Sequence, residues 1–266
     1  MHNYEHQVLH PGQADSENAN LCALAIMTKA PRAGQVKTRL TPPLTGEEAA
    51  ALNVCFLRDL SASIDYADLR SRGIGCYTPV DAKRVYRDIL PPNFQLMAQR
   101  ETDLGHRLIG AITDLLSVGF SAVCLINSDS PTAPAAVFAE AVQVLSQPNE
   151  RLVLGPSDDG GYYLIGMKKL YPRLFEEIDW STERVLAQTL ERASEIGLAV
   201  HLLPPCYDVD DRRTLARLCH DLLGPNEVGE ADIAPATRAF LREIVARIGW
   251  EHIYHSAPSG SPGEHQ

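Results

Sequence analysis

Short apolar runs alternate along the chain with stretches in which apolar residues recur every three to four positions. The runs are apolar on both faces, which is typical of buried strands; we expect strands at 21–28, 73–78, 95–99, 122–127, 152–154, 162–167 and 198–203. The three-to-four-residue repeat predicts helices that start at 45 and 81 and that span 103–118, 134–145, 181–196, 211–223 and 236–248. This alternation predicts one three-layer α/β/α domain with a mostly parallel, mixed sheet.

Helix starts and domain ends are also visible in the pattern. Thr45 followed by Glu48 forms a capping box, and Ser181 is placed to cap the helix after it. We expect a single domain over 21–255, because no linker or repeat interrupts it. Residues 1–20 are polar and residues 256–266 are rich in Ser, Gly and Pro, so we expect both ends to be disordered tails.

The composition excludes several classes of protein. Hydrophobic residues make up 45% and charged residues 22%, which are globular proportions, and the net charge of −10 argues against a nucleic-acid-binding protein. The apolar run near the N-terminus, 21–27, is far too short to span a membrane. The first twenty residues are polar and acidic and have no basic n-region, so we do not expect them to be a signal peptide. The six cysteines show no C-x-x-C spacing. We therefore expect a reduced, cytoplasmic enzyme.

A basic loop follows the first strand. Lys29, Arg32, Lys37 and Arg39 lie within eleven residues that contain one glycine, Gly34, and no carboxylate. In a sheet of this kind ligands bind beyond the carboxyl ends of the strands, so this loop is suited to hold phosphate oxygens. It matches neither a Walker A nor a dinucleotide-binding glycine motif, and a merely solvated loop is the alternative.

Carboxylates follow two further strands. Asp129 comes two residues after the end of the strand 122–127, and Asp208 and Asp210 follow the strand 198–203. Carboxylate oxygens suit Mg²⁺ or Mn²⁺ shared with nucleotide phosphates. Turn chemistry explains Asp129 equally well, and Asp210 or Asp211 is also placed to cap the next helix.

The segment 155–166 contains two acids before a glycine pair. Asp158, Asp159, Gly160 and Gly161 fit a plain hairpin turn. They also fit an acceptor pocket in which Asp159 serves as a base or an orienting group.

Six motifs in order resemble the nucleotide-diphospho-sugar transferase superfamily, which has the glycosyltransferase-A-type fold. They are similar in particular to bacterial glycosyltransferase-like proteins labelled as selenodomain-associated or arsenosugar-biosynthesis transferases. The motifs are TKAPxxGxVKTRL at 28–40, DLGxRL at 103–108, SDSP at 128–131, GPSDDGGYYLIG at 155–166, WST at 180–182 and DVD at 208–210.

The resemblance implies roles for individual residues. Lys29, Lys37 and Arg39 would hold the nucleotide phosphates, and Asp129 and Asp210 would hold the divalent metal. Asp103, Gly105 and Arg107 would lie near the nucleotide. Asp159 and Trp180 would lie on the acceptor side.

These residues predict a metal-dependent transferase that acts on an activated nucleotide. Our first expectation is nucleotidyl transfer from an NTP to a small phosphorylated acceptor, with Lys37, Arg39 and Asp159 as catalytic residues. The alternatives are a glycosyltransferase that uses a nucleotide-diphospho-sugar and a non-catalytic nucleotide-binding module. The expected partners are the nucleotide donor and a small-molecule acceptor, not nucleic acid; the oligomeric state stays open, a homodimer being one option.

Overall fold

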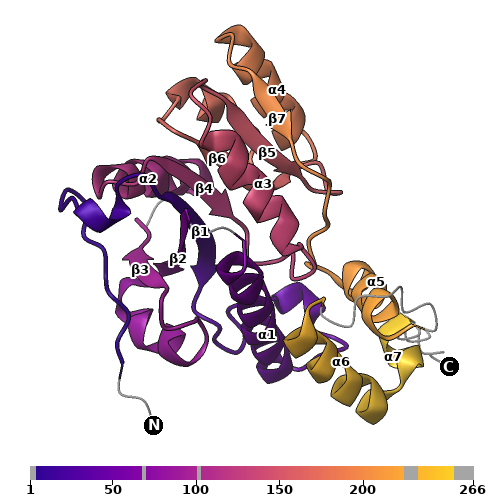
Figure 1. The fold of residues 1–266 in the computed structure, drawn as a ribbon. Helices are drawn as coiled ribbons and strands as arrows, with labels where there is room; N and C mark the ends of the chain where they lie inside the picture. Colours follow the sequence, from indigo (N-terminus) through magenta and orange to yellow (C-terminus); the bar gives the residue numbers. More distant parts are fainter. Residues whose placement is uncertain (1–3, 68–69, 101–102, 225–232, 255–266) are drawn as a thin grey trace, which may run out of the picture.

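A computed structural model describes residues 4–67, 70–100, 103–224 and 233–254. In this part of the chain, seven strands form one sheet in the order β3-β2-β1-β4-β6-β5-β7. The strand β6 runs antiparallel to both β4 and β5, and the remaining pairs are parallel. Figure 1 shows this sheet with helices packed against it. The predicted mostly parallel, mixed α/β sheet is therefore confirmed.

All seven predicted strands are present with small shifts of their ends. They are β1 (Cys22–Lys29), β2 (Ser71–Thr78), β3 (Gln95–Ala98), β4 (Ala122–Ile126), β5 (Leu152–Pro156), β6 (Tyr162–Met167) and β7 (Val200–Leu202). In β4 every residue is buried, as expected for a strand covered on both faces.

Helices cover both faces of the sheet. The α-helices are α1 (Gly46–Asp65), α2 (Leu104–Ser117), α3 (Ala135–Leu145), α4 (Val185–Glu195), α5 (Arg212–Leu223), α6 (Pro235–Ile248) and α7 (Trp250–Tyr254), with 3₁₀ turns η1 (Ser16–Asn18), η2 (Thr38–Leu40), η3 (Val80–Asp88) and η4 (Pro172–Phe175). Alternate residues of β1 enter different cores. Leu24 and Ile26 pack with α1 and α3, whereas Ala23 and Ala25 pack with α2.

A third group of helices packs on the outer side of α1. Buried residues of α5 and α6, among them Leu215 and Leu241, form a separate core with Phe56 of α1. In Figure 1, α5, α6 and α7 lie beside α1, away from the sheet. The carboxylate of Asp59 in α1 accepts hydrogen bonds from the backbone N–H groups of Ala236 (2.9 Å) and Thr237 (2.8 Å). This carboxylate caps α6 and fixes it to α1.

Three helix starts show how well caps are predicted. The capping box at Thr45 and Glu48 is present, as expected. Asp211 caps α5 with a second box, which leaves Asp210 free for another role. The prediction for Ser181 is wrong: α4 begins at Val185, and Ser181 has a φ of 64° in the preceding turn. That turn is held by the Thr182 hydroxyl, which donates to the carbonyl of Asp179 (2.8 Å).

The expected N-terminal tail is wrong for its described part, residues 4–20. The N–H of Leu9 donates to the carbonyl of Leu96 (2.8 Å), and the N–H of Leu96 donates to the carbonyl of Gln7 (2.9 Å). The segment thus pairs with the free edge of β3, and Leu9 is buried in the core beneath it. A polar composition hides such pairing because backbone groups make it. The expected tail at 256–266 lies outside the described residues.

Among the residues that the structure describes, no helix combines the length and the apolar character that a membrane span requires.

Candidate active site

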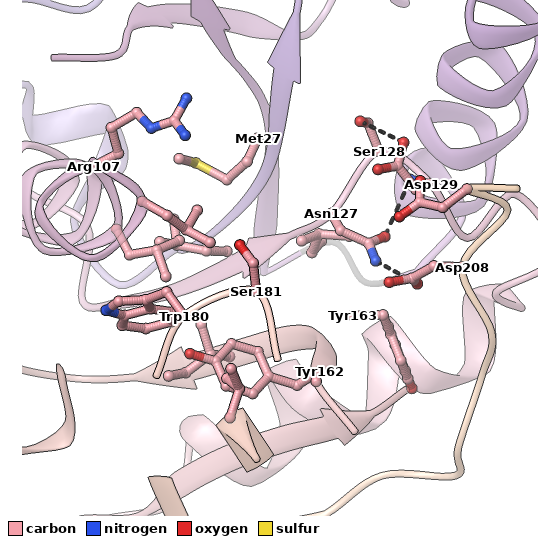
Figure 2. A pocket seen from close by; sticks show the side chains of 18 of the residues that line it. Met27, Arg107, Asn127, Ser128, Asp129, Tyr162, Tyr163, Trp180, Ser181 and Asp208 are labelled. Atoms are coloured by element: carbon pink, nitrogen blue, oxygen red, sulfur yellow. Dashed lines mark hydrogen bonds between the residues drawn. The ribbon is translucent and has the colours of Figure 1, made fainter. Parts of the chain in front are cut away.

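A cavity of about 650 Å³ opens at the carboxyl ends of β1 and β4. A smaller hollow of about 260 Å³ adjoins it and shares Lys29, Arg39, Ser128, Asp129 and Asp210 with its wall. Figure 2 shows Asp129 and Asp208 on one side of the larger cavity and Arg107 and Trp180 on the other. Parallel sheets place ligand sites at this edge, as the sequence predicts.

Two distant stretches of chain bring Asp129 and Asp210 together. The N–H of Val209 donates to the carbonyl of Asp129 (2.9 Å), which fastens the segment after β7 to the loop after β4. The side chains of Asp129 and Asp210 then meet on one atom, the Nζ of Lys37, at 2.6 Å and 3.0 Å. The two predicted metal ligands therefore lie side by side.

The ammonium of Lys37 is nearly fully enclosed. Its side chain is 5% exposed, and Nζ also donates to the carbonyl of Val209 (2.8 Å). Burial by itself lowers the pKa of Lys37, but the charges of Asp129 and Asp210 and their hydrogen bonds outweigh it, so the pKa is raised above its ordinary value. Lys37 is therefore a permanent cation between the carboxylates. The resemblance assigned Lys37 to the nucleotide phosphates, and its contact with Asp129 and Asp210 was not predicted.

Asp208 has different partners from Asp129 and Asp210. Its Oδ1 accepts hydrogen bonds from Asn127 Nδ2 (2.7 Å) and Ser130 Oγ (2.6 Å). Burial raises the pKa of Asp208 to about 6, helped by the charge of Asp129 and opposed by the hydrogen bond from Ser130. Asn127 and Ser130 were not predicted as site residues. Their polar side chains beside a buried strand end are the signal that sequence reasoning left unused.

The donor set at this position fits a small divalent cation. Asp129 and Asp210 offer carboxylate oxygens to one point, and their side chains are 30% and 42% exposed. The described residues contain no cluster of three or more His, Cys, Asp or Glu side chains that would enclose a metal. Two carboxylates with solvent access suit Mg²⁺ or Mn²⁺, which keep waters and take further oxygens from phosphates.

Three other cations line the cavity, and within the described part of the chain none of them has a counter-ion. Lys29, Arg39 and Arg107 have no ion pair with any residue of the described part of the chain. Lys29 and Arg39 border both hollows, next to Asp129 and Asp210. We call Lys29, Lys37, Arg39, Asp129 and Asp210 the charged end. Cations of this kind in an otherwise acidic chain are suited to an anionic ligand.

The opposite side of the cavity, the aromatic end, consists of Leu104, Arg107, Tyr162 and Trp180. Trp180 stacks on Phe175 with ring centroids 6.4 Å apart. Gly105 lies against Trp180: a Cβ at this position would come within 2.6 Å of the indole Nε1. The structure thus places Arg107 and Gly105, predicted near the nucleotide, together with Trp180, predicted on the acceptor side.

The acidic glycine turn divides its residues between two surfaces. Asp159 and Gly161 line the main cavity, and Asp159 Oδ1 accepts from the N–H of Gly161 (2.9 Å). Asp158 turns away and pairs with Arg217 (2.6 Å) beside a different hollow. Gly160 supports the turn, because its φ of +87° and a Cβ position 2.2 Å from the carbonyl oxygen of Glu183 exclude other residues.

Two more predicted residues have structural positions. Asp103 caps α2 by accepting from the N–H of His106 (3.1 Å), and this hydrogen bond lowers the pKa of its carboxyl. Gly34, with a φ of +71°, lies in the basic loop close to Gly46. Neither Asp103 nor Gly34 belongs to the cavity wall that the described residues form.

Comparison with known proteins assigns the family. A protein of Desulfovibrio desulfuricans G20, provisionally named a nucleotide-diphospho-sugar transferase, is 30% identical, with 85% of this chain and 95% of that chain covered and a TM-score of 0.75. Residues 68–182 match the family model described as "Uncharacterized protein conserved in bacteria (DUF2064)". The chain belongs to the nucleotide-diphospho-sugar transferase superfamily. The resemblance inferred from the motifs and the expected transferase class are thereby confirmed.

More distant structures have low identity. A cytidylyltransferase from Leptospira borgpetersenii serovar Hardjo-bovis (strain JB197) is 9% identical, with 90% of this chain and 99% of that chain covered and a TM-score of 0.48. A CMP:2-keto-3-deoxy-manno-octonic acid synthetase complexed with CTP is 9% identical, with 74% and 96% covered and a TM-score of 0.48. Comparison with curated proteins gave no significant match.

Proposed function

We propose that this protein is a metal-dependent transferase that moves a nucleotidyl group from an NTP to a small phosphorylated acceptor and releases pyrophosphate. The observation that carries the proposal is the charged end: two unpaired cations, Lys29 and Arg39, lie beside two converging carboxylates, Asp129 and Asp210. Cations that bind phosphate oxygens next to acids that bind Mg²⁺ or Mn²⁺ are the two halves of a metal–triphosphate site.

In this proposal each end of the cavity has one task. Lys29 and Arg39 hold the triphosphate, and Asp129 and Asp210 hold the divalent cation. The cation supplies charge neutralisation for the leaving pyrophosphate. The aromatic end orients the acceptor, with Arg107 facing its anionic group and Asp159 positioning it. An oxygen of the acceptor phosphate forms a bond to the α-phosphorus, and the bond from that phosphorus to pyrophosphate breaks. This reaction consists mainly of positioning and charge control.

Glycosyl transfer is the second candidate, and the name of the Desulfovibrio relative favours it. The donor would then be a nucleotide-diphospho-sugar, whose diphosphate suits the same charged end. A hydroxyl acceptor would need a base, and Asp159 on the cavity wall is suited to that role. A non-catalytic nucleotide-binding module is the third candidate.

A product assay separates the three candidates. The protein is incubated with Mg²⁺, each NTP in turn and a panel of sugar phosphates, and pyrophosphate is measured. We expect pyrophosphate release that requires one NTP, one acceptor and the metal. Transfer from nucleotide sugars without pyrophosphate from any NTP would favour the glycosyltransferase. Nucleotide binding without turnover of either donor would favour the binding module.

A further inference from the structure

Lys37 uses all of its hydrogen-bonding capacity on the protein. A lysine ammonium has three N–H donors. Lys37 Nζ donates to Asp210 Oδ1 (3.0 Å) and to the carbonyl of Val209 (2.8 Å), and its third close partner is Asp129 Oδ1, in an ion pair at 2.6 Å. In this arrangement no donor is left for a phosphate. The lysine is therefore a ligand of the acid pair, unlike Lys29 and Arg39, which have no ion pair with any described residue.

The ammonium also stands where a shared divalent cation would have to stand. Asp129 and Asp210 are held together by the backbone bond from Val209 to Asp129, and both direct an oxygen at Nζ. A cation bound by the same two oxygens would occupy the same space. It would also meet a net charge of −1 on the three side chains, instead of −2 on the two carboxylates alone.

We propose that Lys37 is a resident counter-ion that excludes free divalent cations from the acid pair until a polyphosphate arrives. This inference depends on the proposed function, because it takes Asp129 and Asp210 as the metal ligands. Lys37, Thr38 and Arg39 line the smaller hollow together with Lys29. A triphosphate held there offers Nζ new acceptors, so the ammonium can leave the carboxylates as the metal enters between them.

The exchange makes metal and polyphosphate binding cooperative. Polyphosphate stabilises the state in which Lys37 has left the acid pair, and the metal binds only that state. Each ligand therefore increases the affinity for the other by the same factor. While Lys37 is bound to the two carboxylates, its ammonium also makes a cation–π contact with the ring of Phe56, whose centroid is 5.5 Å from Nζ.

The test measures Mn²⁺ binding directly, by electron paramagnetic resonance of free Mn²⁺, with inorganic tripolyphosphate as the second ligand. The variants are Lys37→Met, which keeps the stem and removes the charge, and Lys29→Met, the matched control that removes a nearby unpaired charge. For Mn²⁺ alone we expect Lys37→Met to bind at least about tenfold more tightly than wild type. Lys29→Met should bind Mn²⁺ like wild type.

The binding of tripolyphosphate, measured by calorimetry, completes the test. Mn²⁺ should strengthen it in wild type and strengthen it much less in Lys37→Met, where no exchange is needed. Asp129→Asn combined with Lys37→Met should lose the gained Mn²⁺ site. Circular dichroism establishes that each variant is folded, and Lys37→Gln replaces Lys37→Met if that variant does not fold.

Two results would overturn the counter-ion role of Lys37 without affecting the proposed transferase function. Equal Mn²⁺ affinity in wild type and Lys37→Met, with metal-dependent turnover intact, would show that Lys37 does not compete with the metal. An equal gain in Lys29→Met would show that only the general charge matters. Turnover that needs no metal, with no Mn²⁺ binding by any variant, would instead refute the metal-dependent function itself.

Discussion

The two ends of the cavity are built differently. The charged end consists of ionic side chains from the end of β1 and from the segments after β1, β4 and β7, and the ammonium of Lys37 contacts both of its carboxylates directly. The aromatic end consists of the first turn of α2, the start of β6 and the turn before α4, and packing holds its central residue, Trp180, against Phe175 and Gly105. Electrostatics therefore organises one end and packing the other, so substitutions should act differently at each.

The largest effect is expected at Asp129. Asp129→Asn keeps the shape of the side chain and removes one of the two carboxylate charges. We expect metal-dependent turnover to fall by about 10²- to 10³-fold. The domain should still unfold cooperatively, but its unfolding free energy should fall by roughly 1–3 kcal/mol, because the buried ammonium of Lys37 loses one of its two carboxylate charges. Turnover is measured by pyrophosphate release and stability by urea unfolding; a loss of cooperative unfolding would mark Asp129 as structural.

A smaller effect is expected for an unpaired cation of the same end. Arg39→Ala should weaken nucleotide binding by about 10- to 100-fold, since charge-assisted hydrogen bonds to phosphate are lost. The loss should be larger at low salt, where exposed charges are screened less. Calorimetry at two ionic strengths checks this. The control is Lys83→Ala on η3, a lysine that is not part of the cavity wall, and an equal loss there would contradict the local role of Arg39.

Trp180→Ala tests whether the two ends act independently. We expect the acceptor KM to rise by about tenfold, equivalent to about 1.4 kcal/mol, while nucleotide affinity stays unchanged. Gly105→Ala should have a similar effect, because its Cβ would displace the indole. Steady-state kinetics with the acceptor and nucleotide titrations separate the two affinities. A loss confined to nucleotide binding would assign Trp180 to the donor.

The smallest effect is expected at Asp158, whose neighbour Asp159 provides the contrast. Asp158 forms an exposed ion pair with Arg217, a type worth about 0–1 kcal/mol. Asp158→Ala should change turnover by less than about twofold, which a roughly 0.4 kcal/mol change would produce. Asp159→Ala, which alters the cavity wall, should reduce turnover clearly. Turnover of the two variants is measured in parallel. Equal losses would refute the assignment of Asp158 to a different surface.

The charged end was more predictable than the aromatic end for a physical reason. Asp129 and Asp210 follow β4 and β7, two strands that run in the same direction and so end at the same edge of the sheet, where ligand sites form. Because β6 and β5 lie between these two strands, the contact itself is made by the segment after β7, which the hydrogen bond from Val209 to Asp129 fixes. The aromatic end depends on side-chain packing between segments far apart in sequence, and an apolar residue such as Tyr162 or Leu104 looks the same in a core as in a cavity wall. Neighbours in sequence can also separate, as Asp158 and Asp159 do across a turn that needs Gly160.

The pattern of apolar and polar residues by itself determined the strands, most helices and the capping box of Thr45 and Glu48, because periodicity and caps are local properties of the chain. The motifs along it also determined the superfamily. Only the tertiary structure decided that the N-terminal segment pairs with the edge of β3 and that α4 begins at Val185 rather than at Ser181. It also decided that Lys37 binds the carboxylates of Asp129 and Asp210. Each of these depends on which backbone groups or charges from distant parts of the chain come close in space. The spacing of residues along the sequence does not reveal those distances.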